Sequence, residues 1–200
     1  DLCAGPFRVL VHLFEAVIDR MADVLERSFA RLRGTLGAFE RFVPRKFLAV
    51  IAPEGIENIQ VGARQEREMT ILFCDIRGYT SLSESSSPEE MFDFLNEYLA
   101  EMGSAIEAHG GFIDKYIGDA IMALFGAPFV KTGDADRAVS AAVGMVHALR
   151  DFNERRKQAG KDTIGMGIGL NTGQAILGSI GSPKRVGYTA IGDSVNLASR

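Results

Sequence analysis

Two aspartates stand where the sequence most readily suggests chemistry. Asp75 follows the apolar run of residues 69–74, which predicts a buried strand. Asp119 lies at the Gly118-Asp119 turn between two short strand-like segments. If the first strand ends beside that hairpin, the two carboxylates lie close together and repel each other. A bound divalent cation such as Mg²⁺ or Mn²⁺ usually neutralises such a pair. On spacing alone, one turn-forming and one capping aspartate remain the alternative.

Three further polar residues lie near these motifs. Lys115 precedes Asp119 by four residues in a predicted strand, from which it could reach a base or a phosphate, or serve as a solvated edge residue. Asn196 and Arg200 are four residues apart on a predicted helix over residues 193–200, so they are expected to share one face. An amide and a guanidinium side by side suit a phosphate that gains charge during a reaction, and an ordinary helix surface is the alternative.

The composition indicates which kind of ligand the chain could bind and in which compartment it is expected. The chain has 22 basic and 26 acidic side chains, a net charge of −4, which argues against a nucleic-acid binder but permits a small anionic ligand held by local cations or metals. Cys3 and Cys74 lie too far apart to predict a disulfide framework, so a reducing, cytoplasmic location is expected for this chain or for the larger protein that contains it. No apolar run approaches the roughly 20 residues of a membrane span.

The first third of the chain has the pattern of a helix and a connector. Residues 9–33 predict one amphipathic helix with apolar residues at alternating spacings of four and three, the pattern of a two-helix stalk. The seam is Leu10, Phe14, Val17, Met21, Val24 and Ser28. A single helix packed on its own domain is the alternative. Residues 39–52, which contain Pro44, predict a connector.

From residue 69 onward, the elements predict an α+β fold. Ser87, Pro88 and Glu90 form the start signal of a helix, with a capping box and proline at its first position. Its buried stripe is expected to be Phe92, Leu95, Leu99, Met102 and Ile106. A hairpin over residues 112–117 and 120–125, a helix over 134–156 and strands over 163–170, 175–180 and 186–191 follow. This order predicts a split βαβ sheet with both helices on one face.

The glycines of the run Gly165-Met166-Gly167-Ile168-Gly169 alternate with apolar residues inside a predicted strand. A dinucleotide-binding loop would instead place its glycines between a strand and a helix. The run therefore predicts close backbone packing and no dinucleotide site.

Three motifs together resemble the catalytic domain of the class III nucleotide cyclases. In chain order they are Phe73-Cys74-Asp75-Ile76-Arg77-Gly78-Tyr79-Thr80, Gly110-Gly111-Phe112-Ile113-Asp114-Lys115-Tyr116-Ile117-Gly118-Asp119 and Tyr188-Thr189-Ala190-Ile191-Gly192-Asp193-Ser194-Val195-Asn196-Leu197-Ala198-Ser199-Arg200. The resemblance implies a ferredoxin-like βαββαβ core and a catalytic domain over residues 60–200, preceded by a signalling or dimerisation helix and connector over 1–59. It also implies that the C-terminal part of the domain, with more sheet and a triphosphate-binding lysine, lies beyond Arg200.

The resemblance further implies a role for each matching residue. Asp75 and Asp119 would hold two Mg²⁺ or Mn²⁺ ions, with the Ile76 carbonyl as a further ligand. One ion would activate the ribose 3′-hydroxyl toward the α-phosphate, and the other would assist the departure of pyrophosphate. Asn196 would orient the ribose, and Arg200 would stabilise charge on the α-phosphate.

Lys115 and Thr189 match the pair that reads the base in this family. Lysine fits an acceptor on adenine, whereas members that use GTP typically carry glutamate and cysteine at these two positions. Threonine at position 189 resembles a subgroup of adenylyl cyclases, some of which respond to bicarbonate. The resemblance thus implies an adenylate cyclase that converts ATP to cyclic AMP and pyrophosphate. A guanylate cyclase and a catalytically silent nucleotide-binding regulatory domain are the alternatives.

The family's site forms between two domains arranged head to tail. One domain would supply Asp75 and Asp119, and the other would supply Lys115, Thr189, Asn196 and Arg200. Because this chain carries both sets, a homodimer with two equivalent sites is expected. The heptad seam then becomes a dimerising helix, and an upstream sensor or regulatory domain is an expected partner.

Overall fold

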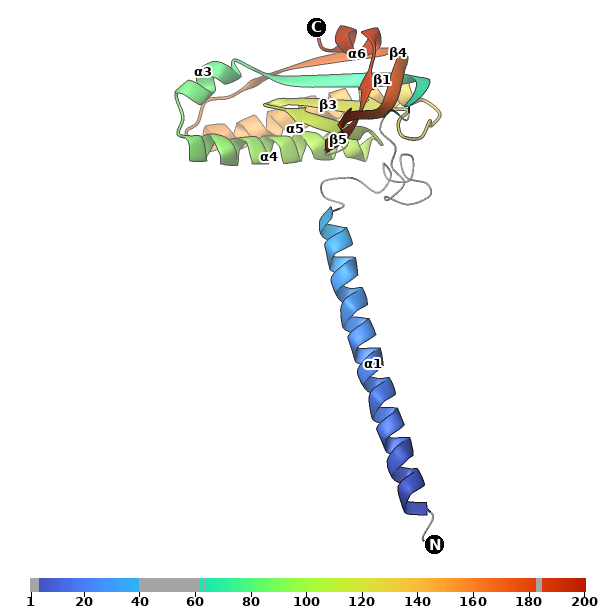
Figure 1. Ribbon diagram of the computed structural model, residues 1–200. Coiled ribbons are helices and arrows are strands. Elements are labelled where there is room, and N and C mark those ends of the chain that lie inside the picture. The colour runs from blue at the N-terminus through green and yellow to red at the C-terminus, as the bar shows by residue number, and fades with distance from the viewer. Residues whose placement is uncertain (1–3, 40–61, 63, 183–184) are drawn as a thin grey trace. The chain divides into compact units, whose positions relative to one another are not determined.

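The computed structural model describes residues 4–39, 62, 64–182 and 185–200 (Figure 1). The chain divides into two compact units, Asp1–Pro53 and Glu54–Arg200, which are described separately. The expected boundary between residues 59 and 60 lies outside the described residues, as does nearly all of the expected connector. The assignment of the first segment to signalling therefore stays a prediction.

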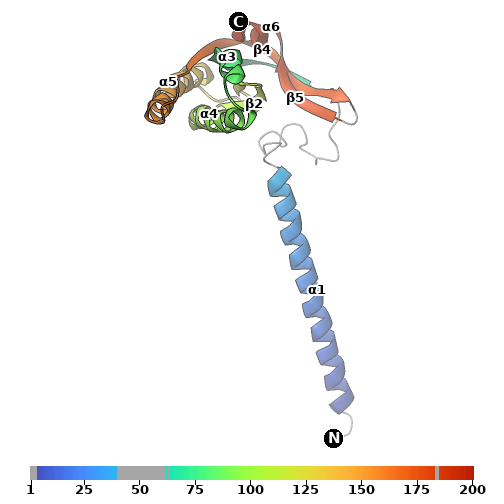
Figure 2. The same ribbon diagram turned by 90° about the vertical axis from the view of Figure 1, so that its left-hand side faces the viewer.

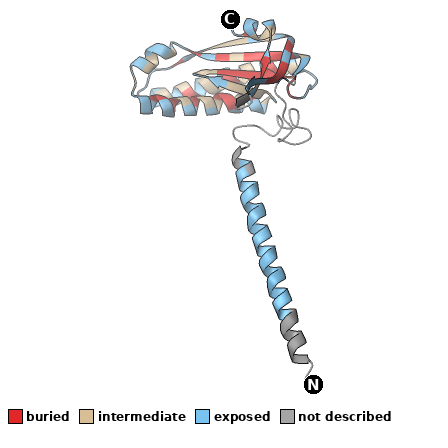
Figure 3. Cartoon of the chain, in the orientation of Figure 1, coloured by how far each residue is buried: buried red, intermediate tan, exposed pale blue. Residues whose placement is uncertain are grey.

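The described part of the first unit is a single helix, α1 (Ala4–Phe39). The predicted helix over residues 9–33 is confirmed and is longer at both ends. Every side chain from residue 12 to residue 35 is exposed, apolar ones included (Figure 3). Within the described part of the chain, no helix combines the length and the apolar character that crossing a bilayer requires.

The second unit is built on one antiparallel sheet. Its strands are β1 (Arg64–Arg77), β2 (Phe112–Ile117), β3 (Ala120–Phe125), β4 (Gly165–Ser182) and β5 (Arg185–Ile191). They lie in the order β2-β3-β1-β4-β5, with every neighbouring pair antiparallel. The predicted split βαβ arrangement is confirmed. The two strands expected over 163–170 and 175–180 are one strand, because β1 pairs with β4 without interruption through the polar residues 171–174.

The two long helices of this unit are α4 (Pro88–Ala108) and α5 (Asp134–Gln158), which pack together on one face of the sheet (Figure 2). The predicted start of α4 is confirmed by its capping box. The Ser87 side chain accepts from the Glu90 amide at 3.2 Å, and the Glu90 carboxylate accepts from the Ser87 amide at 3.0 Å. A short helix that the sequence analysis did not identify, α3 (Tyr79–Glu84), joins β1 to this region.

The buried stripe of α4 differs from the expected one. Met102 and Ile106 are buried as predicted, but Phe92 is 69% exposed. Phe94 and Tyr98 are buried instead, because their rings contact Phe152 of α5 at centroid distances of 6.0 and 6.2 Å. The helix therefore turns its apolar face toward α5 as well as toward the sheet, which the periodicity of α4 alone does not reveal.

The opposite face of the sheet carries a second apolar cluster and a short helix, α6 (Asp193–Ala198). Gly169 of β4 lies directly against the end of this helix, where a Cβ atom would overlap the Ala198 carbonyl oxygen. The close packing predicted for this glycine run is confirmed at Gly169. At Gly167 no described atom lies within 4 Å of the corresponding position.

We expect Gly169→Ala to lower the free energy of unfolding by about 1–3 kcal/mol, because the added methyl group must displace α6 from the sheet. Gly167→Ala is the matched control in the same strand and should change stability by less than about 0.5 kcal/mol. Urea unfolding monitored by circular dichroism measures both values. Equal losses in the two variants would contradict the packing argument.

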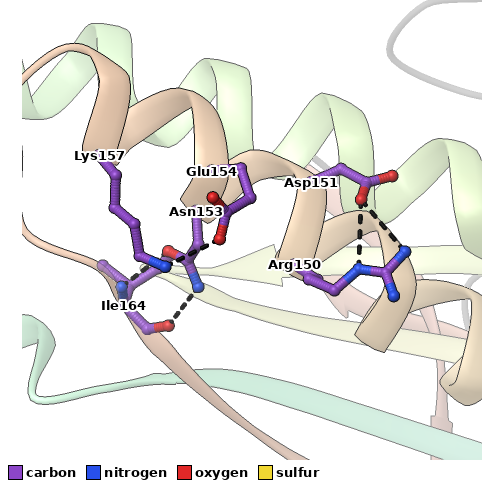
Figure 4. Close-up of polar contacts among 6 residues, drawn as sticks. All are labelled: Arg150, Asp151, Asn153, Glu154, Lys157 and Ile164. Atoms are coloured by element: carbon purple, nitrogen blue, oxygen red, sulfur yellow. Dashed lines mark hydrogen bonds and ion pairs between the residues drawn. The ribbon is translucent and has the colours of Figure 1, made fainter.

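The side chain of Asn153 attaches the C-terminal part of α5 to Ile164, the residue before β4. Asn153 donates from Nδ2 to the Ile164 carbonyl oxygen at 2.9 Å, and its Oδ1 accepts from the Ile164 amide at 2.9 Å (Figure 4). The neighbouring Arg150 and Asp151 make only an exposed ion pair with each other at 3.4 Å. The amide of Asn153 therefore satisfies both backbone groups of the buried Ile164.

We expect Asn153→Ala to lower the free energy of unfolding by about 1–3 kcal/mol, because two backbone groups of a buried residue lose their partners. Arg150→Ala removes an exposed pair from the same helix and should cost less than about 0.5 kcal/mol. The measurement is again urea unfolding, and a larger loss for Arg150→Ala than for Asn153→Ala would refute this account.

Candidate active site

The structure brings Asp75 and Asp119 together, as the sequence analysis predicted. Asp75 lies in β1 and Asp119 lies at the turn between β2 and β3, where Gly118 adopts a φ of 64°. The pKa of Asp119 is raised above its usual value, first by burial and then by a hydrogen bond with Asp75 and its negative charge. Two carboxyl groups in contact form a site that favours a cation.

The backbone of β1 holds this pair in place. The Ile76 amide donates to Asp119 Oδ2 at 3.2 Å, so the turn is tied to the strand beside it. The strand was expected to end before Asp75, but it continues to Arg77 because its pairing with β4 does so. Ile76 itself is buried, and the role of its carbonyl as a ligand stays a prediction.

Strand alternation places Asp75 on the face away from α4 and α5. Its neighbours Cys74 and Ile76 are buried among those helices, so Asp75 points to the opposite face. Cys74 Sγ lies 3.2 Å from the Tyr98 hydroxyl, and burial raises the pKa of this thiol to about 11. The thiol is therefore neutral near pH 7 and adds no further negative charge beneath the two carboxylates.

Lys115 and Thr189 are also brought together, although they come from β2 and β5, the two edge strands of the sheet. Lys115 Nζ donates to Thr189 Oγ1 at 2.7 Å. Three strands separate β2 from β5 in the order of the sheet, so the sheet must curl to bring its edges into contact. Thr189 is 9% exposed, whereas the Lys115 side chain is 40% exposed.

The sequence analysis missed Asp114, which joins these two residues. Its side chain is 0% exposed, its Oδ2 accepts from Thr189 Oγ1 at 2.8 Å, and it lies 3.3 Å from Lys115 Nζ. Burial raises the pKa of Asp114, while the hydrogen bond from Thr189 and the charge of Lys115 oppose that rise. An aspartate inside a predicted strand is unusual and was the signal that could have identified it.

Asn196 and Arg200 are both exposed, at the end of the chain that carries α6. The helix was expected to reach Arg200, and this was wrong, because it ends at Ala198. The Arg200 amide donates to the Leu197 carbonyl at 3.4 Å, which is the i−3 bonding of a tightened last turn. Ser199, between α6 and Arg200, keeps the αR conformation as the cap of the helix.

The site residues thus form two separate groups within one chain. Asp75 contacts Asp119, and Lys115 contacts Thr189. Across residues 64–182 and 185–200, no side-chain hydrogen bond or ion pair joins the carboxylate pair to Lys115 or Thr189. The same described residues contain no cluster of three or more histidine, cysteine or carboxylate side chains able to hold a metal ion, so any cation at Asp75 and Asp119 needs further ligands from backbone, water or substrate.

The sequence profile of the adenylate and guanylate cyclase catalytic domain matches residues 61–200. The chain belongs to this family. The predicted resemblance is confirmed, and the match covers the range expected from the three motifs. Within this family, the chain is 56% identical over 187 residues to an adenylate cyclase from Anabaena cylindrica, covering 92% of this chain and 36% of that relative. The chain therefore spans about a third of that relative's length.

Solved cyclase structures share the fold of the second unit. The guanylyl cyclase Cya2 superposes with a TM-score of 0.65 and 46% identity, covering 68% of each chain. The adenylyl cyclase CyaB from P. aeruginosa superposes with a TM-score of 0.66 and 38% identity, covering 69% of this chain and 72% of that one. The predicted α+β cyclase fold is confirmed. Because these two similar structures are named for different nucleotides, similarity alone leaves the choice of purine to the site residues.

Proposed function

We propose that this chain is the catalytic portion of an adenylate cyclase, which converts ATP to 3′,5′-cyclic AMP and pyrophosphate. The observation that carries the choice of ATP is the contact between Lys115 and Thr189. A lysine ammonium has only donors and so suits an acceptor on the base, such as N1 of adenine. Guanine carries a hydrogen on N1, which a lysine at that position would oppose. The similarity to the Anabaena adenylate cyclase supports the same choice.

A guanylate cyclase is the second candidate, because the guanylyl cyclase Cya2 is 46% identical to this chain. Members of the family that use GTP typically carry glutamate and cysteine where this chain has Lys115 and Thr189. A glutamate accepts a hydrogen bond from the guanine edge, whereas lysine cannot accept one. The residues of this chain therefore favour ATP.

Divalent metal ions are the cofactors that members of this family generally use, and the residues here fit such a cofactor. Asp75 and Asp119 offer oxygen ligands beside each other, and burial together with the neighbouring Asp75 raises the pKa of Asp119. We assign Mg²⁺ or Mn²⁺ to them, two ions per site, with the Ile76 carbonyl as a further ligand. When bound, such ions make the ribose 3′-hydroxyl a better nucleophile and neutralise the triphosphate.

The remaining residues bind and orient the nucleotide. Lys115 and Thr189 hold the base, which fixes the position of the ribose relative to the triphosphate. Asn196 orients the ribose through its amide, and Arg200 donates from its guanidinium to the α-phosphate as charge accumulates there. Both side chains are exposed in this chain and therefore accessible to a nucleotide or to a second chain.

The active unit in this proposal is a head-to-tail homodimer. The carboxylate pair and the base-reading pair form separate groups within one chain, and a second copy would supply the missing partner to each. The exposed apolar seam of α1 supports association, because Phe14, Val17, Met21 and Val24 are 53–68% exposed at heptad spacing. This helix would couple the catalytic domain to an upstream sensor or regulatory domain.

The direct test is the formation of cyclic nucleotides by the purified chain from ATP and from GTP, with Mn²⁺ and with Mg²⁺. The proposal expects cyclic AMP and pyrophosphate in equal amounts, with ATP preferred. A preference for GTP would establish the second candidate. Nucleotide binding without any product would instead indicate a silent regulatory domain.

Asp75→Asn and Asp119→Asn each remove one anionic ligand while preserving side-chain size. We expect each to lower kcat by at least about 100-fold and to weaken the binding of Mn²⁺, measured separately by isothermal titration calorimetry. Asp93→Asn, an exposed position on α4, is the matched control and should change neither quantity. Unaltered Mn²⁺ binding in both site variants would refute the metal assignment.

Mixing two inactive variants tests the shared site. Asp75→Ala and Arg200→Ala chains combined in equal amounts should recover about a quarter of wild-type activity, because random pairing makes half of the dimers mixed and each mixed dimer has one intact site of two. Asp75→Ala mixed with Asp119→Ala is the control and should recover none, since both changes damage the same half. Verified heterodimers without recovered activity would contradict the shared site.

A further inference from the structure

We propose that Asp114 determines which purine the site accepts, by holding the hydroxyl hydrogen of Thr189 so that Oγ1 can only accept a hydrogen bond from the base. This inference rests on the proposed function, because it assumes that Lys115 and Thr189 contact the base. It adds a specificity-determining residue that does not itself touch the nucleotide.

The hydrogen-bond pattern around Thr189 determines the direction of its hydroxyl. A threonine hydroxyl has one hydrogen and two lone pairs and can act as donor or acceptor. Lys115 Nζ, at 2.7 Å, has no lone pair to offer and must donate to Oγ1. Asp114 Oδ2, at 2.8 Å, accepts the hydroxyl hydrogen, and the Ala190 carbonyl lies farther away, at 3.4 Å. Asp114 is the nearer acceptor and the charged one, so it holds the hydroxyl hydrogen inside the protein.

One lone pair of Thr189 and one hydrogen of Lys115 are then left for a ligand. Of the three ammonium hydrogens, one is donated to Thr189 and a second faces Asp114 at 3.3 Å. The two side chains therefore present an acceptor beside a donor. Adenine presents the complementary edge, an N6 amino donor beside the N1 acceptor, whereas guanine presents the O6 acceptor beside an N1 hydrogen.

The burial of Asp114 supports a role beyond stability. Its side chain is 0% exposed, and among the described residues no hydrogen-bond donor reaches its Oδ1. A buried carboxylate with an unpartnered oxygen is costly, and such pairs seldom add net stability. Lys115 and Thr189, both of which contact Asp114, are the proposed base readers. We therefore connect the energetic cost of burying Asp114 with its effect on the base readers: it fixes the position of Lys115 and the direction of the Thr189 hydroxyl.

Asp114→Asn is the decisive substitution. The asparagine amide preserves the shape and can donate to Thr189 Oγ1, which frees the hydroxyl hydrogen to point at a guanine O6. We expect the ratio of kcat/KM for ATP over GTP to fall by at least about tenfold, with GTP use rising in absolute terms. A purely structural role would lower both rates together and leave the ratio unchanged. An unchanged ratio in a folded variant would overturn the inference.

Two controls separate hydroxyl direction from general damage. Thr189→Ser keeps a hydroxyl with the same partners and should keep the preference for ATP, whereas Thr189→Val has the same shape but no hydroxyl and should reduce it. The exposed Asp93→Asn should change neither the ratio nor the rate. Loss of preference in Thr189→Ser would argue that packing, and not the hydroxyl, selects the base.

The wild-type chain provides a test that needs no folded variant. Purine riboside triphosphate lacks a substituent at position 6, and inosine triphosphate carries an oxygen there. If Thr189 can only accept, rates and binding affinities should fall in the order ATP, purine riboside triphosphate, inosine triphosphate. Inosine triphosphate at or above the purine analogue would overturn the inference. A wild-type preference for GTP would instead defeat the proposed function, so the two failures are distinguishable.

Discussion

The pairing of β1 with β3 on one side and β4 on the other is the constraint on which the rest of the second unit depends. The pairing with β4 runs without interruption over the whole of β1, from Arg64 to Arg77, so it determines which side chains of β1 enter each face of the sheet. A slip of one residue would bury Asp75 among the helices and expose Cys74 and Ile76. The apolar packing of α4 and α5 against Cys74 and Ile76 therefore also keeps Asp75 on the opposite face of the sheet, where its side chain is exposed.

Curling of the sheet is the second constraint, and it produces a different kind of site. The contact of Lys115 with Thr189 closes the distance between two edge strands, and the buried Asp114 lies under both. In the proposed reaction, the two carboxylates bind the metal ions that contact the triphosphate, while the cluster of Lys115, Thr189 and Asp114 selects the base. The separation of the two groups within one chain is the physical reason for the proposed head-to-tail dimer, in which each chain would complete the site of the other.

Local signals predicted well where the structure is decided locally. The capping box at Ser87 and the hairpin at Gly118 depend on residues a few positions apart, and both were found as expected. The buried stripe of α4 was predicted correctly at Met102 and Ile106 but wrongly at Phe92. Phe94 and Tyr98 are buried because they face a second helix, whose position the sequence of α4 does not encode.

The sequence by itself determined the family, the order of the elements and most of the candidate site residues, because their motifs are contiguous and carry distinctive residue types. Only the tertiary structure decided that Asp114 belongs with Lys115 and Thr189, since that cluster joins the two edges of a sheet. The direction of a hydroxyl hydrogen depends on which acceptor lies within 3 Å in space. Separation along the chain cannot supply that information, and the choice between two purines rests on it in our proposal.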